Sequence, residues 1–134
     1  MWRVLSLSLV IWATCAQAAN IVADKIETAL DACLSSPEGG STAGAAACFG
    51  YAIDAYDKLL NDIYRHALAA LDPGSVERLR DAQRQWLAFR KADLDALSRL
   101  PDRGTVLRLD VLDAAKKAYR FRIEELALYI PATD

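Results

Sequence analysis

Six polar side chains at helical spacing are the residues of this sequence best placed to do chemistry together. They stand among apolar residues, where a simple amphipathic helix would carry only hydrophobic side chains. Their carboxylate and guanidinium could form a charge-assisted pair, and the amide, hydroxyl and indole groups could add hydrogen bonds. The six residues are Asp57, Asn61, Tyr64, Gln83, Trp86 and Arg90.

These six residues would meet if their two helices fold back on each other at the break 72–75. The antiparallel register then pairs Asp57 with Arg90, and it likewise pairs Asn61 with Trp86 and Tyr64 with Gln83. We interpret the set as a buried polar latch that fixes the register of the two helices. The alternative is a recognition or catalytic cluster. Catalysis fits less well, because pairing with an arginine favours the ionised carboxylate and weakens it as a general base.

Other titratable residues do not converge on a site. His66 follows Tyr64 by two residues and therefore points away from the latch. Carboxylates one or two residues apart on a helix point in different directions, which applies to Asp93 with Asp95 and to Glu124 with Glu125. The sequence has no phosphate-binding loop, metal-ligand spacing or nucleophile elbow. We therefore predict no catalytic, cofactor-binding or metal site, and a protein that is not an enzyme.

The elements that would position these residues are four helices, and no stretch has the alternation of a strand. Apolar residues recur at steps of three and four, and Pro and Gly interrupt them. The predicted fold is an all-α, up-down antiparallel four-helix bundle. Loops 35–44 and 98–104 should lie at one end, and the 72–75 turn and both mature termini at the other. The predicted helices are 20–33, 45–71, 76–97 (with Ser75 as N-cap) and 105–129.

The first nineteen residues have the layout of a secretory signal peptide. Arg3 precedes an apolar run, and Ala16-Gln17-Ala18 forms a cleavage site, so we predict cleavage after Ala18 or Ala19. Lipidation on Cys15 is an alternative that the preceding residues disfavour. The rest, 20–134, is a single helical domain in the periplasm or outside the cell, without a transmembrane segment.

Two cysteines remain after this cleavage, Cys33 and Cys48. An even pair in a small exported domain predicts a disulfide, which would contribute about 3 kcal/mol by loop-closure entropy. The alternative is two buried thiols, and zinc would lack ligands. The bond would close a loop that includes Ser36, Pro37, Glu38, Gly39, Gly40 and Ser41.

Charge is distributed unevenly along the chain. Residues 20–72 contain three basic and eight acidic residues, whereas residues 73–134 contain twelve basic and ten acidic residues. The sequence has no basic stripe of the kind that binds nucleic acid. A mildly acidic first half would favour a cationic partner, and the alternative is that these charges are ordinary solvated helix surface.

Two motifs give the sequence a family resemblance. Asp-x-x-Leu-Asn-x-x-Tyr at 57–64 is followed by Leu-x-x-x-Gln-x-x-Trp-x-x-x-Arg at 79–90. Together with the preceding cysteines, they resemble the LprI-like lysozyme-inhibitor N-terminal domain family of exported bacterial proteins, over residues 33–94. The family motif continues to an aspartate and a cysteine, where this chain has Lys91 and Leu94. Cys33 with Cys48 is then the pairing left to the mature chain.

The resemblance implies a non-enzymatic binding protein whose partner could be a lysozyme. Inhibition would follow if the protein occluded the cleft of that cationic enzyme. We expect the contact at loop 36–41, which is irregular, tied by the disulfide and next to acidic helices. The alternatives are a structural or stress-response protein of the envelope, or an immunity protein against a cell-wall toxin. The oligomeric state cannot be read from the sequence.

Overall fold

The structure is a computed structural model that describes residues 15–101 and 103–132, and within these ranges it is all-α. The predicted fold class is confirmed. Each long stripe of apolar residues forms a helix, and a short 3₁₀ helix, η1, interrupts the first loop. The elements are α1 (Cys15–Leu34), η1 (Pro37–Gly40), α2 (Thr42–Ala69), α3 (Pro73–Ser98) and α4 (Val106–Ala127).

Three helix starts differ by three residues or more from the sequence prediction, and among them α2 begins at Thr42 instead of Ala45. α1 begins at Cys15 instead of Asn20, because the alanine-rich stretch before Asn20 continues the helix and Ala19 is buried in the core. The predicted signal peptide, 1–19, otherwise lies outside the described residues, and its cleavage stays a prediction. α3 is capped by Asp72, not Ser75: the Asp72 carboxylate accepts a hydrogen bond from the Ser75 backbone N–H at 3.0 Å, and Pro73 begins the helix.

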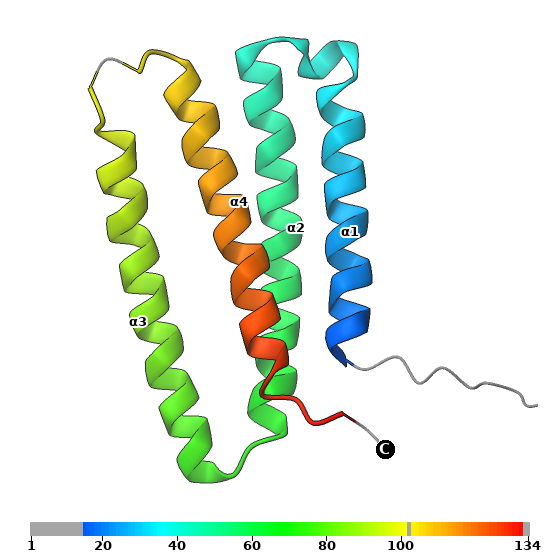
Figure 1. Cartoon of the computed structure of the whole chain (residues 1–134), viewed down its shortest axis with the longest axis vertical. Coiled ribbons are helices and arrows are strands. Elements are labelled where there is room, and N and C mark those ends of the chain that lie inside the picture. The colour runs from blue at the N-terminus through cyan, green and yellow to red at the C-terminus, as the bar shows by residue number, and fades with distance from the viewer. Residues whose placement is uncertain (1–14, 102, 133–134) are drawn as a thin grey trace, which may run out of the picture.

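The chain reverses direction at each connection, and α4 lies between α2 and α3 (Figure 1). α4 packs most extensively on α2, whereas α2 and α3 have almost no direct contact. α1 packs on α2 and on α4. The loops after α1 and α3 lie at one end, and the α2–α3 turn lies at the other with the start of α1 and the end of α4 (Figure 1).

The hydrophobic core is formed mainly by α1, α2 and α4. α3 contributes only Leu79 to its fully buried part, with Trp86 packed against it. The predicted stripe of α2, from Phe49 to Leu71, is buried or half-buried throughout. A second, smaller cluster of Leu30, Cys48 and Ala52 lies near the first loop.

Several residues of the predicted apolar stripes lie at the surface of the bundle. Ile21 and Val22 on α1 are 53% and 42% exposed. Phe89 on α3 and Phe121 on α4 are 62% and 61% exposed, and Leu128 after α4 is 84% exposed. Because α3 packs on α4 and hardly on α2, a single contact face is enough for it, and Phe89 has no helix opposite. A closed four-helix bundle would have covered more of α3.

Candidate functional site

The disulfide-tied end of the bundle is an ordered turn and not an open loop. Cys33 and Cys48 are bonded, with their Cα atoms 5.7 Å apart, which confirms the predicted pairing. The Ser36 hydroxyl donates to the Cys33 carbonyl oxygen at 2.7 Å and accepts from the Gly39 backbone N–H at 3.4 Å. Ser41 caps α2 in the same way, accepting from the Gly44 N–H at 3.0 Å.

Two glycines let η1 pack directly against the ends of α1 and α2. A Cβ on Gly39 would lie 2.3 Å from the Cys33 carbonyl oxygen, and a Cβ on Gly44 would lie 1.7 Å from the Glu38 carbonyl oxygen. Neither distance is compatible with a side chain, so both positions need glycine for close backbone approach. The disulfide, two hydroxyl caps and two glycine contacts therefore fix the shape of this turn.

Glu38 is the acidic residue that this turn presents to solvent. Its side chain is exposed, and hydrogen bonding to its own backbone N–H lowers its pKa below the usual value. The carboxylate is consequently ionised across the neutral range. The candidate loop, 36–41, thus displays a fixed negative charge on a rigid support.

The predicted latch does not form as the hairpin register required, because α4 separates its two halves. Asp57 does not meet Arg90. Its carboxylate instead accepts hydrogen bonds from Asn61 on its own helix at 3.2 Å and from the Tyr119 hydroxyl of α4 at 3.3 Å. Arg90 pairs with Asp93 at 2.7 Å and reaches the Ala114 carbonyl oxygen at 3.4 Å. Asp57 and Arg90 therefore each contact α4, but not each other.

Gln83 and Trp86 also contact α4. The Gln83 amide oxygen accepts a hydrogen bond from Arg122 Nε at 2.9 Å, in a buried position. The Trp86 ring meets the edge of Tyr119, with centroids 6.0 Å apart, and the Arg122 guanidinium carbon lies 5.9 Å from the Trp86 ring centroid. Burial and the charge of Asp57 raise the pKa of Tyr119. Tyr64 packs against the hydrophobic core.

A second polar network, which the sequence analysis missed, joins α1, α2 and α4. Tyr56 is fully buried, and its hydroxyl donates to Glu27 Oε1 at 2.6 Å. Lys116 Nζ lies 2.7 Å from the other oxygen of Glu27. Arg120 forms an ion pair with Asp24 at 2.8 Å and lies 3.8 Å from Glu27. Burial and the bond to Glu27 raise the pKa of Tyr56.

The two networks join the helices through paired and hydrogen-bonded charges. Burial opposes ionisation of Glu27, but hydrogen bonds from Lys116 and Tyr56 outweigh it and lower its pKa. Buried charges of this kind are tolerated when they are paired. In the described ranges, no group of three or more His, Cys, Asp or Glu residues could hold a metal ion. Nor is any described helix long and apolar enough to cross a membrane.

The fold and its turn define a small, disulfide-bonded helical protein with a closely packed turn at one end. Residues 33–126 match the model of the family described as lysozyme inhibitor LprI. The chain belongs to this family. The match extends past residue 94, where the sequence motifs ended, and so includes Tyr119 and Arg122 on α4. Neither the curated proteins nor the solved structures contain a match to this chain.

Proposed function

We propose that this protein is an exported, non-enzymatic inhibitor that binds a cationic lysozyme and occludes its substrate cleft. Membership of the lysozyme inhibitor LprI family supports this function. The disulfide fits a location outside the cytoplasm. The contact surface is the η1 turn, residues 36–41, with Glu38 at its centre.

The close packing of the η1 turn, tied by the Cys33–Cys48 disulfide, is the observation that carries this choice of surface. Association loses free energy when flexible loops must become ordered, and a preformed turn avoids that loss. At Gly39 and Gly44 the backbone of η1 lies so close to the neighbouring helix ends that no side chain fits between them. The exposed, ionised carboxylate of Glu38 would meet a cationic surface and speed association.

Occlusion needs no chemistry from the inhibitor. A lysozyme cleaves its polysaccharide with two carboxyl groups in an open cleft, which the sugar chain must enter. A rigid projection held across that cleft would exclude the chain. For this mechanism the inhibitor needs only to stay folded and to remain bound to the enzyme.

A turbidity assay of lysozyme-dependent cell lysis tests the proposal. Purified protein in micromolar excess should slow lysis, and a variant that lacks residues 36–43 should not. The melting temperature of the variant must be measured beside it, to show that it is folded. Full lysis in the presence of the intact protein would contradict the proposed function.

A further inference from the structure

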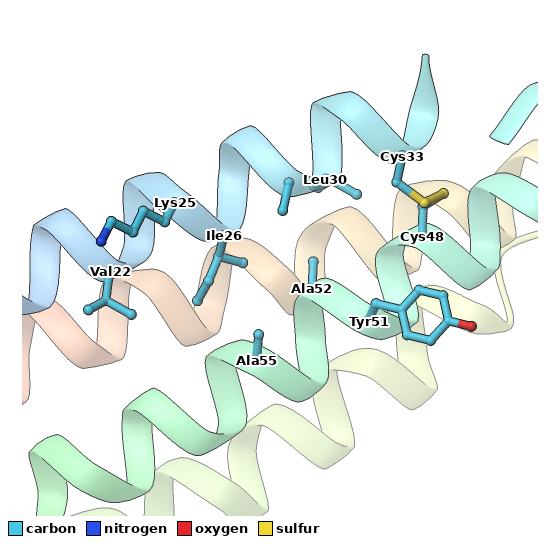
Figure 2. Close-up of a pocket in the computed structure, with 10 residues that line it drawn as sticks. Val22, Lys25, Ile26, Leu30, Cys33, Cys48, Tyr51, Ala52 and Ala55 are labelled. Atoms are coloured by element: carbon cyan, nitrogen blue, oxygen red, sulfur yellow. A yellow bond between two sulfur atoms is a disulfide. The ribbon is translucent and has the colours of Figure 1, made fainter. Parts of the chain in front are cut away.

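An apolar groove runs between α1 and α2 on the side that α4 does not cover. Its volume is about 340 Å³. Figure 2 shows Val22, Ile26 and Leu30 of α1 above Ala52 and Ala55 of α2, with Lys25 at one end. The Cys33–Cys48 disulfide and Tyr51 lie at the other end (Figure 2).

The walls of the groove leave apolar surface open to solvent. Val22 is 42% exposed and Tyr51 is 72% exposed. The small side chains of Ala29, Ala52 and Ala55 also line the groove. The volume lies at the small end of the range for small-molecule sites, so one narrow chain fits better than a folded element of another protein.

The charged residue that lines this groove is Lys25. Beyond the groove on α2, Lys58 follows Ala55 by about one turn, and the exposed Asp54 lies about one turn before Lys58. Both lysines are exposed, and within the described ranges neither has a carboxylate at salt-bridge distance. The neighbouring acidic residues of α1 face elsewhere, because Asp24 pairs with Arg120 and Glu27 pairs with Lys116, both on α4.

We propose that this groove binds the acyl chain of a fatty acid, with its carboxylate at Lys25. The aliphatic walls match a single unbranched chain, and Lys25 supplies the opposite charge at the end where the chain emerges. The site is separate from the proposed lysozyme contact. A cationic enzyme would be repelled by Lys25 and Lys58, whereas it would be attracted to Glu38.

Displacement of a fluorescent fatty acid, dansylaminoundecanoate, by dodecanoate tests this site on the mature protein. Saturable one-to-one binding is expected, and the methyl ester of dodecanoate should bind about tenfold more weakly because it lacks the charge. Lys25→Glu should weaken dodecanoate binding by about tenfold. Ala29→Trp, which places an indole in the groove, should abolish it. Lys91→Glu on α3 is the charge-matched control and should leave binding unchanged.

Three results would overturn the proposal. The first is absence of saturable binding to the folded protein. The second is equal binding of dodecanoate by Ala29→Trp, or equal affinity for the acid and its ester. The third is a dimer in light scattering that Ala29→Trp converts to monomer while dodecanoate fails to bind, which would mean that a second copy covers the groove. The lysis assay is independent of all three.

Discussion

The amide oxygen of Gln83 on α3 accepts a hydrogen bond from Nε of Arg122 on α4, 2.9 Å away in a buried position. Arg122 is only 8% exposed, and its guanidinium also lies over the Trp86 ring and pairs with Glu125 at 3.0 Å. Because α3 hardly contacts α2, this cluster is its main polar attachment to the bundle.

Replacement of Gln83 by Leu should therefore destabilise the protein. The change leaves a buried guanidinium N–H without an acceptor, which costs about 1–3 kcal/mol. Urea unfolding followed by circular dichroism measures the loss. Gln85→Leu, on the exposed side of the same helix, is the matched control and should change little. Equal losses in the two variants would refute the role assigned to Gln83.

Tyr56→Phe tests the second network. The variant keeps the ring but removes the hydroxyl that donates to Glu27 at 2.6 Å. Loss of a hydrogen bond to a charged group should lower the free energy of unfolding by about 1.5–3 kcal/mol. Tyr51→Phe, whose ring is 72% exposed, should unfold at the wild-type urea concentration. A Tyr56→Phe protein as stable as wild type would mean that this hydroxyl is not structurally important.

The same network predicts that the free energy of unfolding decreases at acidic pH. Hydrogen bonds and nearby cations lower the pKa of Glu27 in the folded protein below the ordinary glutamate value of 4.5. Its contribution is therefore complete above pH 4.5 and is lost as pH falls through the lower folded value. Urea unfolding from pH 7 down to pH 3 should show this decline, and Glu27→Gln should flatten it. If the free energy of unfolding of Glu27→Gln fell with pH as steeply as that of wild type, the decline would belong to other carboxylates.

Two glycines of α2 provide a matched test of the η1 turn. Gly44→Ala would place a Cβ 1.7 Å from the Glu38 carbonyl oxygen, whereas a Cβ on Gly50 would meet nothing within 4 Å. Gly44→Ala should displace η1, cost about 1–3 kcal/mol and weaken inhibition. Gly50→Ala should stabilise the helix by about 0.5–1 kcal/mol and leave inhibition intact. Stability and the lysis assay together check both variants, and equal behaviour would argue against a tightly packed turn.

Local patterns in the sequence were sufficient for the helices and the disulfide. The apolar steps of α2, from Phe49 to Leu71, and the Cys33–Cys48 pair depend on near neighbours in the chain. The partners of the latch residues could not be found in this way. The predicted pairs assumed that the consecutive helices α2 and α3 pack against each other. Instead, α4 lies between them, and Asp57, Gln83 and Arg90 each form a hydrogen bond with α4.

The buried cations were hidden for a related reason. Lys116 and Arg122 resemble solvent-facing charges on a helix, and only the fold brings Glu27 and Gln83 to them. The rigidity of the loop was also invisible in the sequence. Its Pro and Gly residues predicted only a break between two helices, whereas Gly39 and Gly44 in fact permit close packing of η1. Glu38 could be identified from the sequence as the acidic residue of that loop, but the packing of the turn that carries it could not.

The most direct test of the proposed function is the inhibition constant of Glu38→Lys in the lysozyme lysis assay. Glu38 is exposed, so the variant should fold as wild type does. Glu77→Lys, at the opposite end of the bundle on an exposed part of α3, is the control for net charge. We predict an inhibition constant about tenfold higher for Glu38→Lys, or about 1.4 kcal/mol, and a change below about twofold for Glu77→Lys. Equal inhibition by the two variants would contradict the assignment of the η1 turn as the lysozyme contact.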